Sequence, residues 1–207
     1  MIQLSERQRD ALAEFINISF GRTSAALSKL TGQRVLLYPP EVSICVLDEL
    51  FGVLSKLVSE EVATVHQIFD GPMAGDAFLL LNYAGAVELA HLFLEAPAPA
   101  ERLDASAREV LTEVGNILLN ACLGMLGNLL DIRITFSVPR LRLESLESLL
   151  RTLVIGREEL RYAMLIYTRF HLRDSDIGGY LVIALGVSSM ERLIQAVETW
   201  ETSYGAR

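Results

Sequence analysis

Apolar residues recur with a helical period over two long stretches of the chain, residues 4–30 and about 104–130. Thr31-Gly32 directly follows the first stretch, and a glycine at this place is typical of a helix C-cap. Within each stretch several polar side chains share one narrow stripe, because residues four and seven positions apart lie on the same helix face. The pattern predicts two long amphipathic helices, each with a buried side and an exposed side.

After each long helix, the same four elements are predicted in the same order: an extended segment broken by proline, a short helix, a hairpin and a last helix. In the first half they span residues 34–47, 48–58, 60–83 and 85–94, and in the second half residues 132–143, 144–154, 158–185 and 188–200. The hairpin turns are expected near residues 70–72 and 174–179, where Gly178-Gly179 is typical of a turn. The Pro/Ala-rich segment 95–104 is the expected connector.

This repetition predicts one domain, residues 1–207, made of two repeats, about 1–97 and 103–207. We interpret the repeats as an internal duplication with pseudo-two-fold symmetry. Strands that follow one another through tight turns pair antiparallel, so the predicted class is α+β, with a mostly antiparallel sheet and helices packed on it.

Composition narrows the range of functions. The chain has 207 residues, 51% of them hydrophobic, which is enough for a sizeable core. Its net charge of −8 and its lack of a Lys/Arg cluster argue against nucleic-acid binding. The N-terminus has no apolar signal region, and polar residues interrupt the apolar stretches, so no membrane span is expected. We expect a soluble cytoplasmic protein.

The cysteines and histidines do not form a recognisable site. Cys45 and Cys122 each lie in an apolar context and are expected to be buried small residues rather than nucleophiles. His66, His91 and His171 are isolated from one another, with no second ligand at helical or turn spacing. Packing is therefore the preferred interpretation of the histidines, and no metal site is predicted.

The polar stripe of each long helix carries an acid, a second acid one turn later and then an asparagine. These residues are Asp10, Glu14 and Asn17 in the first helix, and Glu109, Glu113 and Asn116 in the second. The simplest interpretation is a solvated helix face. Asparagine, however, is a poor residue for a helix interior, because its amide competes for backbone hydrogen bonds. A mid-helix asparagine at the same phase in both helices favours a functional role.

Each asparagine is followed by a proline after the same 22 intervening residues, from Asn17 to Pro40 and from Asn116 to Pro139. The pattern Glu-x2-Asn-x22-Pro is expected by chance at a given start about once in 10⁴. Duplication explains why the pattern occurs twice, but not why both copies retain it.

This pattern resembles the signature of the CheC/CheX/FliY family of chemotaxis phosphatases, Asp/Ser-x3-Glu-x2-Asn-x22-Pro. The first half matches at every position, and the second half has Glu109 where aspartate or serine is expected. Two sites on one chain of about this length are similar to CheC. CheX resembles a single-site relative, and FliY carries an additional flagellar-switch domain for which no residues remain here.

The resemblance implies hydrolysis of the aspartyl phosphate on a CheY-like response regulator, which would supply the Mg²⁺, so that the chain needs no cofactor of its own. Each asparagine would position the attacking water, and the glutamate before it would dock on a lysine of the regulator. The implied catalytic residues are Glu14, Asn17, Glu113 and Asn116, the implied partner-binding residues are Asp10 and Glu109, and the implied structural residues are Pro40 and Pro139.

Two other roles remain open. CheC relatives are similar in pairing with the receptor deamidase CheD, so the chain could be a non-catalytic binding module that regulates CheD. It could also be a flagellar-switch adaptor, since the family resembles the middle domain of switch proteins. The retained Glu/Asn pairs argue against a scaffold, which has no need of a water-holding amide.

Overall fold

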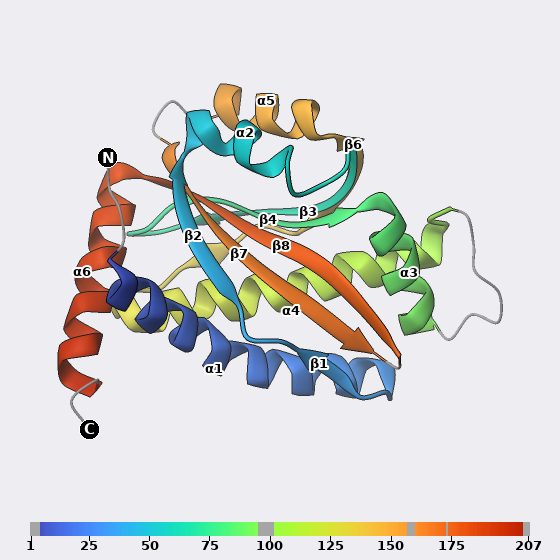
Figure 1. Cartoon of the computed structure of the whole chain (residues 1–207), viewed down its shortest axis with the longest axis horizontal. Coiled ribbons are helices and arrows are strands. Elements are labelled where there is room, and N and C mark those ends of the chain that lie inside the picture. Colours follow the sequence, from blue (N-terminus) through green and yellow to red (C-terminus); the bar gives the residue numbers. More distant parts are fainter. Residues whose placement is uncertain (1–4, 95–101, 157–159, 173, 205–207) are drawn as a thin grey trace.

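The computed structural model describes residues 5–94, 102–156, 160–172 and 174–204 (Figure 1). Helices α1, Glu6–Thr31, and α4, Ala105–Leu130, are the two long helices that the sequence predicts. The side chains of Ser5 and Asp104 cap their N-termini by accepting backbone N–H groups. Gly32 ends α1 with a φ of 68°, in the left-handed region that glycine adopts at little cost, so the predicted C-cap is confirmed.

The remaining elements follow the predicted order in both halves. In the first half they are β1 (Val35–Leu37), β2 (Glu41–Val46), the 3-10 turn η1 (Leu47–Glu49), α2 (Leu50–Leu54), β3 (Glu61–Asp70), β4 (Gly75–Asn82) and α3 (Tyr83–Leu94). In the second half they are β5 (Thr135–Phe136), β6 (Arg140–Ser145), α5 (Leu146–Gly156), β7 (Leu160–Leu172), β8 (Ser175–Gly186) and α6 (Val187–Tyr204). Most of the predicted connector, residues 95–101, lies outside the described residues. The origin of the two halves by duplication stays a prediction.

The eight described strands form one antiparallel sheet in the order β1-β7-β8-β4-β3-β5, with β2 also beside β7 and β6 also beside β3. The hairpins β3–β4 and β7–β8 form the centre and join through β4 and β8. The outer side of each hairpin is paired with the edge strands of the other half of the chain. The predicted α+β class with a mostly antiparallel sheet is confirmed.

Proline interrupts both edges of the sheet. Pro39-Pro40 separates β1 from β2, and Pro139 directly precedes β6. Proline has no N–H to donate to a strand ladder and is tolerated best at a sheet edge. Beside the first interruption, Thr168 Oγ1 donates a 3.0 Å hydrogen bond to the Tyr38 carbonyl, and the Arg169 guanidinium lies 4.6 Å from the centre of the Tyr38 ring.

Helices cover both faces of the sheet (Figure 1). The long helices α1 and α4, with α3 and α6, pack on one face around the larger core, and the short helices α2 and α5 cover part of the other around a smaller core. Among the described helices, α4 alone is long and apolar enough to cross a membrane, and 56% of its apolar window is buried inside the fold. Such burial is what the central helix of a packed core requires.

The prediction that Gly178-Gly179 forms the turn of the second hairpin is wrong, because the chain turns before Ser175. Strand β8 begins at Ser175, so Gly178 and Gly179 lie inside it and pair with β7. A Cβ atom on Gly178 would lie 2.9 Å from the Tyr167 hydroxyl oxygen, and one on Gly179 would lie 2.8 Å from Leu81 Cδ2. These glycines therefore make room for neighbouring side chains and do not turn the chain. The first predicted turn, near residues 70–72, is confirmed, because β3 ends at Asp70.

Close packing of α4 on β3 depends on Gly115, where a Cβ atom would lie 2.6 Å from Val65. We expect G115A to lower the free energy of unfolding by about 1–3 kcal/mol, because the helix and strand must separate. Gly124 in the same helix has open space around it, so G124A is expected to be neutral or to stabilise by up to about 1 kcal/mol. Urea unfolding of both variants measures the difference, and equal losses would contradict the close contact.

Candidate functional site

The polar stripe of α1 faces away from the core. Asp10 and Glu14 are exposed and Asn17 is partly exposed, whereas Leu12 and Ile16 on the opposite side of the helix are buried. Amphipathic packing explains this arrangement, because the apolar side of the helix is fixed against the sheet. The structure thus brings the first predicted acid, acid and amide together on one accessible face.

The stripe of α4 is arranged in the same way. Glu109 and Glu113 are exposed and Asn116 is partly exposed, whereas Leu111 and Val114 are buried. No element of the described chain buries either set of acids. A partner protein can therefore reach the stripe on each helix.

The stripe carboxylates have no partner within the described part of the chain. The side chains of Asp10, Glu14 and Glu113 make no hydrogen bond or ion pair with another described residue. An exposed carboxylate of this kind can form a charge-assisted hydrogen bond with a lysine or arginine of an incoming partner. The stripes therefore combine negative charge with an amide that can both donate and accept.

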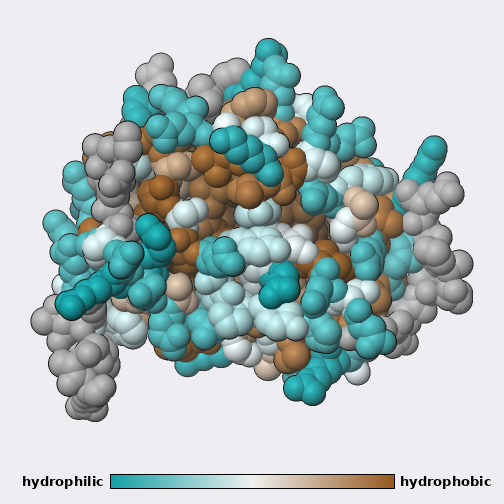
Figure 2. All heavy atoms as spheres, in the orientation of Figure 1, coloured by the Kyte–Doolittle hydropathy of each residue, from teal (hydrophilic) through white to brown (hydrophobic). Residues whose placement is uncertain are grey.

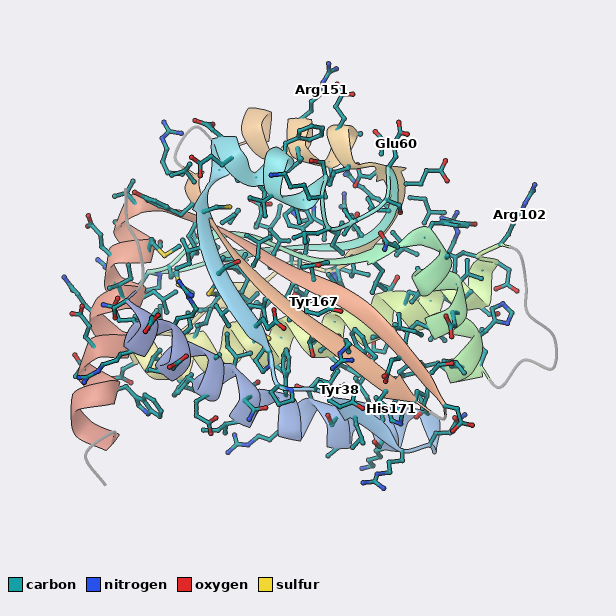
Figure 3. The ribbon with its side chains drawn as sticks, in the orientation of Figure 1. Tyr38, Glu60, Arg102, Arg151, Tyr167 and His171 are labelled. Carbon is teal, nitrogen blue, oxygen red and sulfur yellow. The ribbon has the colours of Figure 1, made fainter. Side chains whose placement is uncertain are left out.

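An open hollow of about 690 Å³ lies beside the α1 stripe. Asp10 of α1 and the start of β2, at Pro40 and Glu41, line it together with Tyr167 and Tyr180. Figure 2 shows hydrophobic residues gathered on this face beneath α2, and Figure 3 shows Tyr167 near its centre. Asp10 and Pro40, far apart in the sequence, thus border one site. The sequence indicated neither tyrosine as part of it.

The Tyr180 hydroxyl has a raised pKa. Desolvation raises the pKa of Tyr180, and the neighbouring Tyr167 and Glu41 raise it further. The two tyrosine rings lie 4.9 Å apart, centre to centre. The lining of the hollow thus combines these two rings with the carboxylates of Asp10 and Glu41 and the guanidinium of Arg9.

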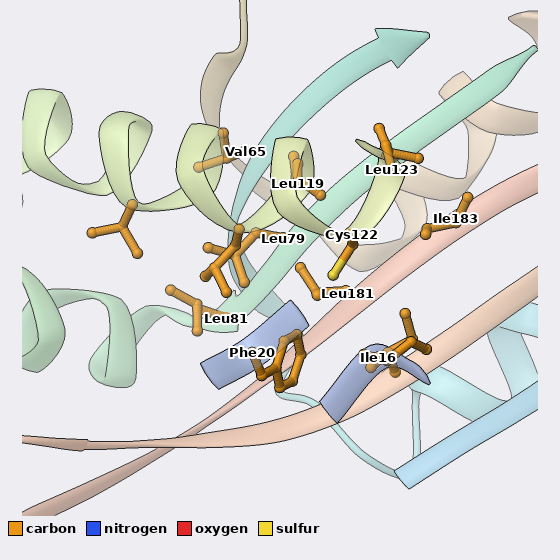
Figure 4. Packing of buried hydrophobic residues seen from close by; sticks show 14 of the residues in the cluster. Ile16, Phe20, Val65, Leu79, Leu81, Leu119, Cys122, Leu123, Leu181 and Ile183 are labelled. Atoms are coloured by element: carbon orange, nitrogen blue, oxygen red, sulfur yellow. The ribbon is translucent and has the colours of Figure 1, made fainter. Parts of the chain in front are cut away.

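The buried sides of the two long helices fix the direction of the stripes (Figure 4). Ile16 and Phe20 of α1, and Leu119 and Leu123 of α4, are fully buried against the central strands. The helices also contact each other and run in opposite directions. Because both helices are held on their apolar sides, neither can rotate its acids inward without exposing core residues.

One exposed apolar residue beside the α1 stripe was not indicated by the periodicity. Ile18, next to Asn17, is 51% exposed, whereas its counterpart Ile117 is partly buried. An exposed isoleucine beside the acids and the amide gives that side of α1 an apolar contact for a partner.

The asparagines of the two stripes differ in their surroundings. Nδ2 of Asn120 donates a 2.8 Å hydrogen bond to Oδ1 of Asn116. Asn17 makes no side-chain hydrogen bond with any described residue, and the residue one turn after it is Gly21. The amide of Asn116 is thus held from within its own helix, and that of Asn17 is not.

The histidines take part in packing contacts. His66 Nε2 lies 2.7 Å from an Asp76 carboxylate oxygen, and the His66 ring stacks on Phe78 at 4.3 Å. His171 Nδ1 lies 2.6 Å from Asp176. Within the described ranges, no group of three His, Cys, Asp or Glu side chains could hold a metal ion.

Both cysteines are free thiols with raised pKa values. Burial raises the pKa of Cys122 to about 12. Burial, and secondarily the charge of Glu49, raises the pKa of Cys45 to about 11. Cys122 is buried, as the sequence predicted, whereas Cys45 is only partly buried. Since the thiolate is the nucleophile, the raised pKa values make both thiols weak nucleophiles at neutral pH.

At pH 8 a thiol with a pKa of about 11 is ionised to roughly one part in a thousand. We therefore expect a thiol-exchange reagent to label neither cysteine of the folded protein at the rate of a free thiol, and to label both after unfolding in urea. Labelling should accelerate as the pH rises towards the pKa of Cys45. A C45S variant assigns the signal, and rapid labelling of Cys45 at pH 8 would contradict the raised pKa of its thiol.

Two sequence similarities to known proteins include or overlap the region of this site. Residues 8–44, from before Asp10 to beyond Pro40, match the CheC-like family. The flagellar motor switch phosphatase FliY of Bacillus subtilis strain 168 is 26% identical over 144 residues, which is 68% of this chain and 36% of FliY. The chain therefore spans about a third of the length of this relative.

Solved structures share the fold. FliY of Thermotoga maritima superposes with a TM-score of 0.75 at 17% identity, covering 96% of this chain and 99% of the other. The FliM middle domain of H. pylori gives a TM-score of 0.64 at 13% identity, covering 93% and 99% of the two chains. A CheC-like superfamily protein from Shewanella gives 0.50 at 10% identity, covering 82% and 96%.

The chain thus has the fold of a class of chemotaxis and flagellar-switch proteins. In sequence, residues 8–44 are similar to the CheC-like family and 144 residues are similar to FliY, and the FliY structure shares the fold. The closer resemblance to CheC within this family stays a prediction.

Proposed function

We propose that this chain is a chemotaxis signal-termination phosphatase that hydrolyses the aspartyl phosphate of a CheY-like response regulator in the cytoplasm. The observation that carries the proposal is that two solvent-facing helix stripes each present a carboxylate and, three residues later, an asparagine. The similarity to FliY, a protein named as a phosphatase, supports it.

Hydrolysis of the aspartyl phosphate requires few catalytic groups from the phosphatase. A water molecule attacks phosphorus, the bond from phosphorus to the aspartate oxygen breaks, and phosphate and the free carboxylate are released. The regulator supplies Mg²⁺ and the phosphorylated aspartate, so the missing part is an oriented nucleophile. The carboxamides of Asn17 and Asn116 can each donate one hydrogen bond to a water and accept another from it, which fixes the water in line without an ionisation. Glutamine has this role in some GTPases.

The acids beside each asparagine are proposed to bind the regulator. In the proposed complex, Glu14 and Glu113 pair with a lysine of the regulator, and the outermost acids, Asp10 and Glu109, contact its periphery. Both glutamates are exposed and have no partner within the described chain, so docking breaks no existing ion pair. A pair that becomes shielded from water at the interface gains strength relative to an exposed one.

A binding module is the alternative. FliM middle domains, at TM-scores of 0.62 and 0.64, share this fold. In this alternative the chain binds CheD or flagellar-switch components and releases no phosphate. Binding that is unchanged by loss of both asparagines, together with no phosphatase activity in the wild-type protein, would support it.

The central test replaces both asparagines. We expect N17A/N116A to lower regulator-dependent phosphate release by about 100-fold, because the water loses its orientation while the fold is kept. Each single variant should retain the activity of the other site. N128A removes an exposed asparagine of α4 from outside the stripe and should keep full activity. Phosphate release from the purified phosphorylated regulator is the measurement, and a fully active double variant would refute the assignment.

The docking role of the glutamates gives a different kinetic signature. We expect E14A/E113A to raise the KM for the phosphorylated regulator more than it lowers kcat, because the lost contact is made before the chemical step. Raised salt should also increase the KM of the wild-type protein, because it screens the ion pair between the glutamates and the lysine of the regulator. An unchanged KM in the variant would show that these carboxylates do not dock the regulator.

A further inference from the structure

The two asparagines of the site are not held equally. In α4, Asn120 Nδ2 donates a 2.8 Å hydrogen bond to Asn116 Oδ1, one helical turn away. In α1, the position one turn after Asn17 is Gly21, which has no side chain and is exposed. The two stripes thus agree in their acids and asparagine but differ in what fixes the asparagine.

We propose that Asn120 is a positioning residue that orients the carboxamide of Asn116, so that the α4 site is organised before the regulator arrives and the α1 site is not. This inference rests on the function proposed above. The hydrogen bond occupies one of the two lone pairs of Asn116 Oδ1 and leaves the second lone pair and the Nδ2 group for a water. An amide fixed in advance does not have to be ordered during the reaction.

The surroundings of Asn120 indicate that it is not there for stability. Its Oδ1 atom is buried and has no hydrogen-bond partner among the described residues. An unsatisfied buried acceptor destabilises the fold, and asparagine has a lower helix propensity than alanine. A residue that is unfavourable for its own helix but orients a site residue has the character of a functional residue.

In the α1 site, the missing orienting residue can be added instead of removed. A Cβ atom built on Gly21 meets no atom within 4 Å, so a side chain fits there without displacing a neighbour. An asparagine at this position would lie one turn from Asn17, at the spacing that joins Asn120 to Asn116. The arrangement of the α4 site can therefore be transferred to the α1 site by one substitution.

Variants that keep only one of the two sites allow each site to be measured by itself. N17A leaves the α4 site, and in that background we expect N120A and N120L to lower kcat by about two- to tenfold, with a KM for the phosphorylated regulator changed by less than about twofold. N120L nearly keeps the size of the side chain but can neither donate to Asn116 nor accept from it, so it separates the hydrogen bond from packing. N128A in the same background should keep kcat.

The reciprocal variant is built on N116A, which leaves the α1 site. There, G21N is expected to raise kcat by about two- to tenfold, and G21A, which adds no amide, is expected to leave kcat unchanged. A gain of rate from G21N cannot be explained by loss of stability.

Thermal unfolding distinguishes positioning from a structural role. We expect the Tm of N120A to equal or exceed that of its parent, whereas a residue needed for packing would lower it. The proposal is overturned if N120A keeps kcat in the N17A background, or if kcat and Tm fall together. Full phosphate release by N17A/N116A would instead refute the proposed function itself.

Discussion

Antiparallel pairing between β4 and β8 is the interaction on which the rest of the structure depends. It joins the two hairpins into one sheet, and each hairpin then receives its outer neighbours from the other half of the chain, β2 on β7 and β6 on β3. The long helices need this continuous surface, because a helix with one apolar side is stable only when that side is covered. Neither half could bury its long helix on a complete sheet of its own.

The same burial determines the candidate site. Since Leu12 and Leu118 fill the core, the opposite side of each helix faces water, and there each helix carries its acids and its asparagine. The close contact at Gly115 holds α4 near β3 just where the stripe runs. The chemistry of the site is therefore carried by rigid helices rather than by loops, which suits side chains that have to aim a water.

Local sequence patterns determined much of this arrangement. Helical periodicity, the cap at Gly32 and the prolines at the strand interruptions predicted the elements. The phase of the stripes predicted that their acids are exposed, but not that Ile18 is. The pairing across halves could not be predicted, because the partner of an edge strand leaves no mark in its own sequence. Gly178-Gly179 was misinterpreted because glycine has the same local preference for a turn as for a tight contact. The link from Asn120 to Asn116 required coordinates.

The exchange of edge strands has a consequence for how the polypeptide acquires its shape during synthesis. Strand β2 is synthesised early, but its partner β7 spans Leu160–Leu172, near the end of the chain. The ribosome must therefore produce most of the protein before these two strands can pair. Until then the nascent first half carries open strand edges, which are prone to pair with other chains. Contacts so distant in sequence are also slow to form. The exchange of edge strands thus delays the completion of the sheet, and of the surface on which both long helices pack, until late in synthesis.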